Sequence, residues 1–173
     1  MNDMLKGILN RRSIRKYKDQ SIPKELITTL LQAAMSAPSA CNQQPWHFVV
    51  IEDKKVLNEI SKIHSGFHVL KGSPLAILVC GEPQATQLDF YWEQDCSAAT
   101  LNIILAAKAC ELGAVWLGIN PRGGEDSDTI RKIVNLPDHI VPFSLVSVGY
   151  AAEAPAPADR YNESKIHYGS LWC

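Results

Sequence analysis

The chain has 173 residues, of which 46% are hydrophobic and 20% are charged, and its formal net charge is -1. These values are typical of one globular domain with a substantial core, so we expect residues 1–173 to fold as a single domain. The near-neutral charge argues against nucleic acids or anionic membranes as partners. No apolar run reaches the ~20 residues of a membrane span and no signal-peptide core is visible, so we expect a cytosolic protein.

Hydrophobic periodicity predicts five elements in the first half of the chain. They are helices at 3–9, 23–37 and 56–63 and strands at 46–51 and 75–80. The second helix is expected to hold Pro23 in its first turn and to end before Pro38, which disfavours helical geometry in the preceding residue. The continuous apolar run LAILVC at 75–80 is typical of a buried strand.

Four more elements complete the predicted domain. They are helices at 89–112 and 126–135 and strands at 114–119 and 142–150. Gly113 is expected to cap the long helix at its C-terminus. Taken alone, the alternation of helices and strands predicts a doubly wound fold with a parallel sheet.

The last segment, residues 151–173, differs in character from the rest. It begins with the Ala/Pro-rich stretch AAEAPAPA, which predicts extended backbone. Tyr161, Tyr168 and Trp172 follow, although disordered tails are poor in aromatic residues. We therefore expect an arm that lies on another surface, such as that of a partner subunit, with a frayed tail as the alternative.

The five cysteines show no CxxC pair and no spacing typical of metal ligands. They are Cys41, Cys80, Cys96, Cys110 and Cys173. In a reducing cytosol these residues are expected to be free thiols, and no metal site is predicted.

Residues 11–18 (RRSIRKYK) form a basic segment with five cationic residues among eight. Arginine offers forked donors that match a phosphate group, and Ser13 adds a hydroxyl. The segment indicates a phosphate site, although charge runs more commonly form a solvated face.

Residues 37–48 (APSACNQQPWHF) join a predicted helix to a predicted strand and are rich in amides. Because amides carry both donors and acceptors, this proline-bounded stretch favours hydrogen bonding to a planar heterocycle. The alternative is a turn that caps its own backbone, which would explain Ser39 and Asn42 but not the density of polar groups.

Residues 113–121 (GAVWLGINP) end a strand with small residues, which allow a ligand to approach the backbone closely. By themselves they are better explained as a buried strand followed by a turn.

Together these three segments resemble the nitroreductase superfamily, whose members carry RRSxRxY/F, APSxxNxQPWxF and GxxWLG motifs in this order. The helix that contains residues 95–102 (DCSAATLN) matches as well. The resemblance implies an α+β fold with a mixed, mostly antiparallel sheet flanked by helices. It also implies a homodimer that exchanges the C-terminal arm, with the alanine-rich long helix as a candidate for the interface. We prefer this fold to the parallel sheet that periodicity predicts.

The resemblance further implies that FMN binds at the dimer interface. Arg11, Arg12 and Ser13 would hold the phosphate and ribityl end, and Arg160 would pair with the phosphate. Arg15 would approach the pyrimidine edge, where a cation stabilises negative charge on the flavin.

The remaining expected contacts are Pro38, Ser39, Asn42 and Gln44 of the other subunit and the backbone of Gly118 and Ile119. His68 stands where some members place a lysine near the ring. A second basic residue often found two positions before the family's phosphate arginine is Ala158 here, which predicts weaker phosphate binding.

The implied activity is an FMN-dependent transfer of hydride from NAD(P)H to nitroaromatic, quinone or similar acceptors by a ping-pong mechanism. No side chain is an obvious general acid or nucleophile, and no GxGxxG fingerprint follows a strand. Two alternatives share the same site. One is a specialised flavin enzyme, either a dehydrogenase or a flavin-cleaving enzyme, and the other is a flavin-binding or storage protein without NAD(P)H turnover.

Overall fold

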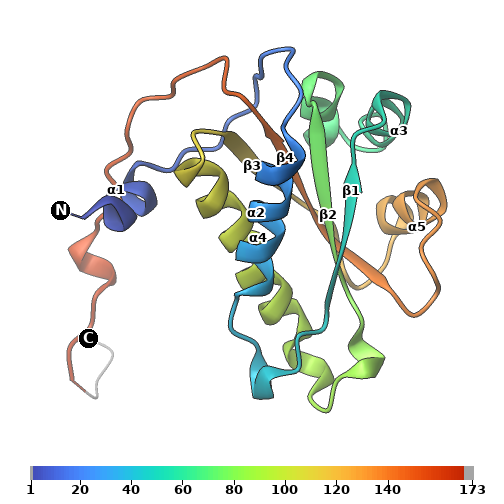
Figure 1. Ribbon diagram of the computed structural model, residues 1–173. Helices are drawn as coiled ribbons and strands as arrows, with labels where there is room; N and C mark the ends of the chain where they lie inside the picture. The colour runs from blue at the N-terminus through green and yellow to red at the C-terminus, as the bar shows by residue number, and fades with distance from the viewer. Residues whose placement is uncertain (1, 170–173) are drawn as a thin grey trace.

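The computed structural model describes residues 2–169, which form an α+β fold built on one antiparallel sheet (Figure 1). The four strands lie in the order β1-β2-β4-β3. Their bounds are Trp46–Ile51 for β1, Leu75–Gly81 for β2, Gly113–Gly118 for β3 and Val141–Gly149 for β4. The central strands are therefore β2 and β4, and β1 and β3 form the edges.

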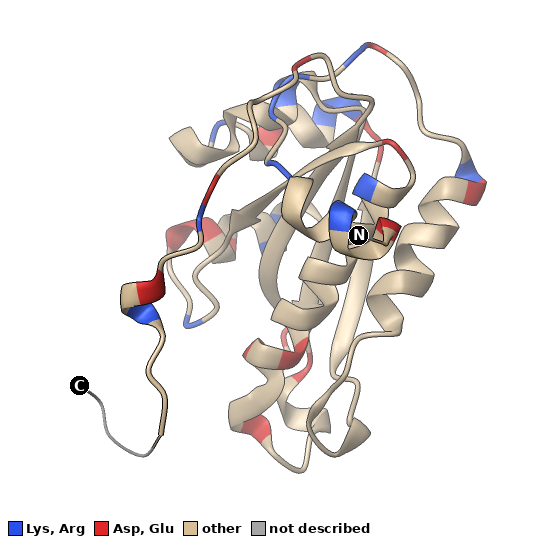
Figure 2. Ribbon diagram, turned by 90° about the vertical axis from the view of Figure 1, so that its left-hand side faces the viewer, with Lys and Arg blue, Asp and Glu red and all other residues tan. Residues whose placement is uncertain are grey.

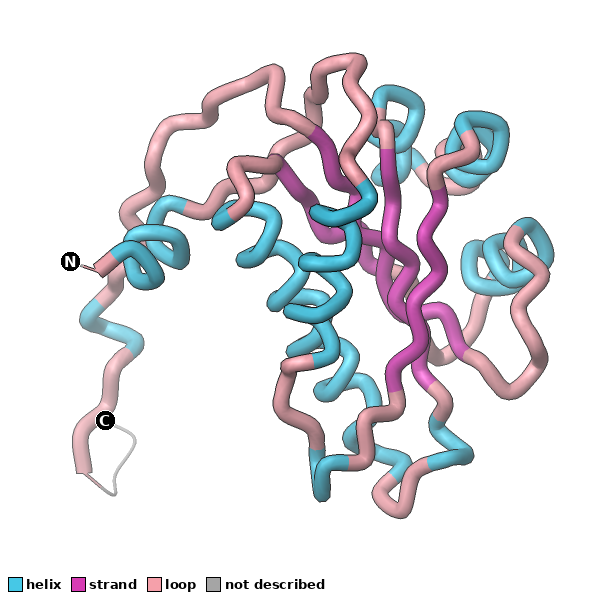
Figure 3. Tube along the Cα trace, in the orientation of Figure 1, coloured by secondary structure: helices cyan, strands magenta, loops and turns pink. Residues whose placement is uncertain are grey.

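Helices cover both faces of this sheet. The α-helices are α1 (Asp3–Asn10), α2 (Lys24–Met35), α3 (Lys54–Ile60), α4 (Trp92–Ala109) and α5 (Glu125–Ile133). The 3-10 helices are η1 (Ala40–Asn42), η2 (Ser65–Gly72), η3 (Pro83–Ala85), η4 (Asp89–Tyr91) and η5 (Glu163–Lys165). α2 and α4 pack on one face, and α3 and α5 pack on the other (Figures 1 and 3).

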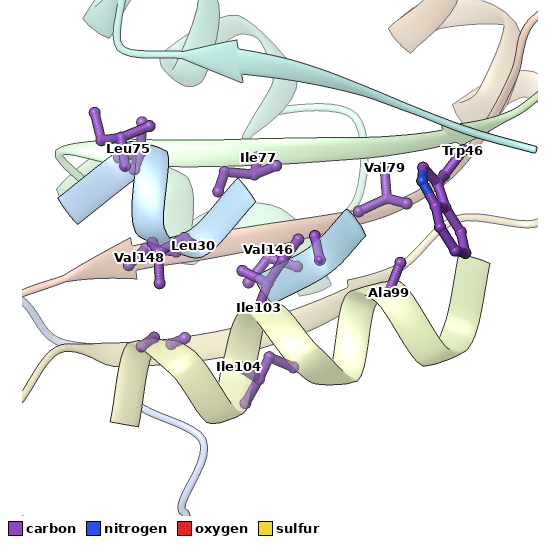
Figure 4. Close-up of a cluster of buried hydrophobic side chains, with 14 of the residues drawn as sticks. Leu30, Trp46, Leu75, Ile77, Val79, Ala99, Ile103, Ile104, Val146 and Val148 are labelled. Atoms are coloured by element: carbon purple, nitrogen blue, oxygen red, sulfur yellow. The ribbon is translucent and has the colours of Figure 1, made fainter. Parts of the chain in front are cut away.

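The core lies on both sides of β2, all of whose residues are buried. Leu75, Ile77 and Val79 point into the cluster beneath α2 and α4 (Figure 4), whereas Ala76 and Leu78 point into the cluster beneath α3 and α5. Because a strand alternates its side chains between two faces, both sets must be apolar. This alternation explains the uninterrupted run that the sequence shows here.

The doubly wound parallel sheet predicted from periodicity is wrong. All three strand pairs are antiparallel. Covering both faces produces the same apolar run in either strand direction, so the pattern shows burial but not direction. The α+β sheet flanked by helices is confirmed, and its parallel component among the described residues is one isolated bridge between Ser13 and Ala114.

Two helix ends differ from the sequence predictions. Pro23 is the N-cap of α2 and lies outside its first turn. α4 ends at Ala109, and Glu111 takes the left-handed conformation (φ 59°) that a capping glycine was expected to provide. Gly113 is instead the first residue of β3.

The alanine-rich helix α4 packs against α2 of its own chain. Ala99 and Ala107 are fully buried in the cluster that also contains Leu30 of α2. Asn102 of α4 also donates a hydrogen bond to the carbonyl of Ala33 (2.9 Å). The close helix packing expected from the alanines therefore occurs within the chain.

The outer elements leave large apolar side chains uncovered. α1 has no buried residue, and Met4 is 77% exposed. The arm after β4 runs away from the sheet in an extended path, apart from η5 (Figure 1), with Tyr161 74% and Tyr168 84% exposed. Trp172 lies outside the described residues.

Two sequence predictions concern cysteines and membrane spans. The described cysteines are free, as predicted: Cys41, Cys80, Cys96 and Cys110. Cys173 lies outside the described residues. No helix within residues 2–169 has the length and apolar character needed to cross a membrane.

Candidate functional site

The basic segment, residues 11–18, crosses the end of the sheet at which β3 begins and β4 ends. Ile14 donates its N–H to the carbonyl of Ala114 (3.0 Å), and Lys18 donates to the carbonyl of Tyr150 (2.8 Å). These bonds extend the pattern of the sheet into the segment. Its backbone is fixed by them, and its cationic side chains remain available for a ligand.

Glu153 holds the middle of the basic segment from the start of the arm. Its carboxylate accepts the N–H groups of Arg15 (2.5 Å) and Lys16 (3.2 Å). Ala152 adds a bond from its own N–H to the carbonyl of Lys16 (2.9 Å). No sequence pattern singles out Glu153, because a lone glutamate beyond a strand carries no motif.

Two glycines let the basic segment lie this close to the sheet. A Cβ atom on Gly113 would lie 2.6 Å from Cγ2 of Ile14, and one on Gly149 would lie 2.7 Å from Cδ1 of Tyr17. Such distances are too short for carbon atoms, so a larger residue would push the segment away. Close approach, rather than helix capping, is what Gly113 provides.

Tyr17 anchors the basic segment through a buried hydrogen-bond network. Its hydroxyl donates to the carbonyl of Ile14 (2.7 Å) and lies 3.0 Å from the hydroxyl of Ser147, which in turn lies 2.9 Å from that of Ser73. Burial raises the pKa of Tyr17 above its ordinary value, although the Ser147 hydrogen bond opposes this shift. The phenol therefore stays neutral and keeps its donor.

Arg11, Arg12 and Arg160 form a cationic cluster. Burial lowers the pKa of Arg11, and the neighbouring charges of Arg160 and Arg12 lower it further. Within residues 2–169 none of these three side chains forms an ion pair or a hydrogen bond. Figure 2 shows the basic residues along the segment and the arm. Cations held together without a counter-ion favour an anionic ligand.

A cleft of about 390 Å³ lies beside this cluster, between the basic segment and the C-terminal end of α4. Arg11 and Arg12 line it, together with Ile104 and Lys108 of α4 and with Glu153. The N–H groups of Arg15 and Lys16 both bond to one oxygen of Glu153, Oε1. The cleft lining thus combines three cations, Arg11, Arg12 and Lys108, with two carboxylates, Glu111 and Glu153.

The amide loop, residues 37–45, has an unusual backbone. Cys41, Asn42 and Gln44 all have positive φ angles, of 49°, 54° and 49°. Non-glycine residues rarely adopt this conformation unless their surroundings impose it. Ser39 contributes through its hydroxyl, which accepts the N–H of Gln44 (3.1 Å). Asp95 of α4 adds two hydrogen bonds, which it accepts from Ala40 and Gln43 of the loop. The sequence motif did not mark Asp95 as part of the site.

The exposed side chains of the loop keep free hydrogen-bonding atoms. The amide nitrogen of Gln44 donates to the side-chain oxygen of Asn42 (3.1 Å). The nitrogen of Asn42 and the oxygen of Gln44 have no partner within residues 2–169. Pro38 is exposed beside them. One free donor and one free acceptor on a rigid loop suit a planar heterocycle.

Gly118 and Ile119 differ in what they can offer a ligand. Ile119 is buried and donates its N–H to the carbonyl of Phe143 (3.1 Å). Because N–H groups alternate in direction along an antiparallel strand, the N–H of Gly118 points to the open edge of β3. No atom would lie within 4 Å of a Cβ at Gly118. Of the two predicted residues, Gly118 has the more accessible backbone.

Three further predicted residues lie at the end of the sheet that the basic segment crosses. Ser13 forms the bridge to Ala114. Arg15 is exposed, and its side chain forms no hydrogen bond or ion pair within the described residues. His68 is also exposed and lies on η2, with its Nδ1 3.1 Å from the carbonyl of Ser61. Within residues 2–169, no hydrogen bond or ion pair joins its side chain to the basic segment.

The predicted residues fall into two groups at opposite ends of α4. The cleft with Arg11 touches Lys108, whereas the amide loop is bonded to Asp95. Thirteen residues separate these two positions, which corresponds to about 20 Å of helix. One chain therefore does not bring its own arginines and its own loop together.

The family model described as Nitroreductase family matches residues 8–67 and 66–150. The chain belongs to the nitroreductase family. This finding confirms the resemblance seen in the sequence motifs. A nitroreductase-family relative from Methanothermobacter thermautotrophicus, provisionally named NADH dehydrogenase/NAD(P)H nitroreductase, is 43% identical over 166 residues, which cover 95% of this chain and 86% of the relative.

Solved nitroreductase-family structures share the whole fold. One from Parabacteroides distasonis, with the same provisional name, has a TM-score of 0.93 and 38% identity and covers 99% of this chain and 100% of its own. A provisional nitroreductase from Desulfovibrio desulfuricans was solved in complex with FMN. It has a TM-score of 0.84 and 28% identity, and the match covers 99% of both chains.

Proposed function

We propose that this chain is an FMN-dependent oxidoreductase that passes hydride from NAD(P)H to nitroaromatic, quinone or similar acceptors. The observation that carries the proposal is the cluster of Arg11, Arg12 and Arg160, whose side chains form no ion pair within residues 2–169. Guanidinium groups form forked, charge-assisted hydrogen bonds with phosphate, so this donor set fits the phosphate of FMN. When bound, FMN would supply the hydride chemistry that no side chain of the site offers.

The amide loop supports the same cofactor. The free donor of Asn42 and the free acceptor of Gln44 match the pyrimidine edge of a flavin, which presents groups of both kinds. Pro38 and Ser39 shape the loop around them. Arg15 would bring a positive charge to the ring and Gly118 an open N–H, and both groups favour negative charge on the flavin.

The two halves of the site belong to different subunits in this proposal. About 20 Å of α4 separates them within one chain. In a two-fold symmetric dimer, the basic segment of one subunit faces the amide loop of the other, and the same pairing occurs twice. The homodimer then holds two equivalent sites.

The exposed apolar surface supports this dimer. Met4, Leu5, Ile8 and Leu9 make half of α1 apolar and exposed, and Leu101 adds to this surface from α4. Exposed apolar side chains of this kind are typical of a subunit interface. We extend the proposal to the arm, whose exposed tyrosines would pack on the partner subunit.

Donor and acceptor are expected to use the same open site in turn. The sequence holds no separate dinucleotide fingerprint, so NAD(P)H must leave before the acceptor enters. Double-reciprocal plots with a quinone or a nitroaromatic should therefore be parallel, as in ping-pong kinetics. Intersecting lines would require a second site and would contradict this part of the proposal.

The cofactor and the donor can be tested together. Purified protein should be yellow, and acid should release FMN rather than FAD at about one equivalent per chain. Anaerobic mixing with NADH or NADPH should bleach the colour rapidly. Colourless protein that does not bind added FMN would overturn the proposal. A yellow protein that neither nucleotide bleaches would instead support the storage alternative or a flavin enzyme with another donor.

A further inference from the structure

Asp95 is a buried carboxylate in the first turn of α4, with only 5% of its surface exposed. Its Oδ1 accepts the N–H of Ala40 (2.9 Å), and its Oδ2 accepts the side-chain amide of Gln43 (2.9 Å). No cation pairs with Asp95 in the part of the chain that the structure describes. Because a buried charge is unfavourable unless its oxygens are hydrogen-bonded, Asp95 and the loop depend on each other.

Gln43 extends this connection to the segment that precedes α4. Its amide nitrogen also approaches the carbonyl of Leu88 (3.3 Å), and its oxygen accepts the N–H of Leu88 (3.4 Å). The side chain of Gln43 is thus used completely inside the protein. It differs in this from Asn42 and Gln44, which keep free atoms at the surface.

The two bonds of Asp95 enclose two of the three loop residues that have positive φ angles. Ala40 and Gln43 directly flank Cys41 and Asn42, whose φ angles are 49° and 54°. A left-handed conformation in non-glycine residues persists only when neighbouring groups fix it. Asp95 fixes the residue before this pair and the residue after it.

We propose that Asp95 is a positioning residue for the flavin, because it holds the amide loop in the strained form that presents Asn42 and Gln44 to the site completed by the partner subunit. This inference rests on the proposed function. Asp95 faces the interior and acts only through the loop. A loop ordered before binding loses less conformational entropy when the ligand arrives, so its anchor should affect affinity.

The carboxylate is better suited to this position than an amide would be. Both groups that approach it are donors, and a carboxylate offers only acceptors. The start of a helix also favours negative charge. An asparagine would direct its NH2 group at a donor, either the N–H of Ala40 or the NH2 group of Gln43. Gln43 could accept from it only by turning over, which would break the pairing with Leu88.

The test compares Asp95→Ala and Asp95→Asn with Asn102→Ala. Asn102 lies on the same helix and makes a polar bond to α2, so its removal should destabilise the protein without affecting the loop.

Apoprotein is titrated with FMN, the visible circular dichroism of the bound flavin is recorded, and Tm is measured. We expect Asp95→Ala to raise the Kd for FMN about tenfold or more and to change the flavin dichroism, with Asp95→Asn intermediate. Asn102→Ala should leave both readouts as in the wild type.

If Asp95→Ala and Asn102→Ala lower Tm similarly and leave the Kd and dichroism equally unchanged, the positioning role is overturned. If Asp95→Ala does not fold, Asp95→Asn takes its place because it preserves the side-chain volume. Hydrogen exchange of the Ala40 N–H without flavin gives an independent measurement. Faster exchange in Asp95→Asn than in Asn102→Ala supports the role, and equal exchange contradicts it. A wild type that binds no FMN overturns the proposed function instead.

Discussion

The basic segment and the amide loop are both irregular stretches that leave side chains free for a ligand, but the chain holds them in different ways. Backbone hydrogen bonds to the sheet hold the basic segment, the side chains of Tyr17 and Glu153 add to them, and Gly113 and Gly149 leave it room to lie against the sheet. Side chains fix the amide loop, chiefly Asp95, and they impose a backbone conformation that is unfavourable by itself. Added volume should therefore disturb the first region, and the loss of one polar group should disturb the second.

Separating the subunits of the proposed dimer should have the largest effect, because it would divide the two regions that we propose make up each site. Met4→Glu together with Leu9→Glu places charges on the exposed apolar face of α1. We expect a monomer in sedimentation velocity, with loss of most of the bound flavin. Met4→Leu is the matched control and should remain dimeric and yellow. A monomer that retains its FMN would show that one chain is sufficient for the site.

Removing a cation from the basic segment should weaken FMN binding without unfolding the protein. Arg11→Ala deletes one charge-assisted contact to the phosphate, so we expect a loss of about 1.5–3 kcal/mol of binding free energy. Titration of the apoprotein with FMN measures this loss. Lys24→Ala, an exposed cation at the start of α2, is the control and should not change affinity. Equal affinity in Arg11→Ala and the wild type would mean that the segment is only a solvated face.

Filling the space left by a glycine should displace the basic segment. Gly113→Ala puts a methyl group 2.6 Å from Ile14, and overpacking of this kind costs about 1–3 kcal/mol of the free energy of unfolding. Gly118→Ala on the same strand has no atom within 4 Å of the added Cβ and is the control. Urea denaturation of both variants checks the difference. Similar stability in the two variants would show that the segment does not depend on this close approach.

Removing the Tyr17 hydroxyl should have the smallest effect. Tyr17→Phe keeps the ring but deletes the bonds of the hydroxyl to Ile14 and Ser147, and one such bond is worth about 0.5–1.5 kcal/mol of the free energy of unfolding at pH 7. Denaturant unfolding at pH 7 measures this difference. A variant as stable as the wild type would show that packing of the ring alone holds this end of the segment.

The same substitution should alter the response to alkaline pH. Burial raises the folded-state pKa of Tyr17, so its contribution is complete below the unfolded pKa of about 10 and is lost as the pH rises above that value. Burial also raises the pKa of Cys80 to about 12, and burial raises that of Cys96 as well, so both thiols add to the alkaline loss. Unfolding measured between pH 8 and about pH 11 should show a shallower decline in Tyr17→Phe than in the wild type. Identical slopes would contradict the shift.

Local patterns in the sequence predicted the elements well because burial depends on periodicity. The strand WHFVVI was predicted with the bounds that β1 has, Trp46–Ile51. Strand direction was not available from these patterns, since β2 is apolar throughout in either arrangement. The family resemblance corrected the direction through its motifs, which periodicity alone does not use.

The candidate ligand contacts were also visible in the sequence, whereas the residues that support them were not. Arginines and amides stand out by their density in short segments. Glu153 and Asp95 act on residues far away along the chain, and Glu153 lies 138 positions after Arg15. Their importance depends on which elements meet in space, and a single sequence does not state this. Gly113 shows the same limit, since its position after a helix suggested a cap while its true neighbour is Ile14.

Mixed dimers test most directly whether each site joins the basic segment of one subunit to the amide loop of the other. Arg11→Ala chains and chains with both Asn42→Ala and Gln44→Ala should each bind FMN poorly as homodimers. When the two are unfolded, mixed in equal amounts and refolded, half of the dimers should be mixed, and each should hold one intact site. We predict that FMN titration will show wild-type affinity at about a quarter of all sites. No recovery of high-affinity sites, with mixed dimers confirmed by mass spectrometry, would contradict a site shared between subunits.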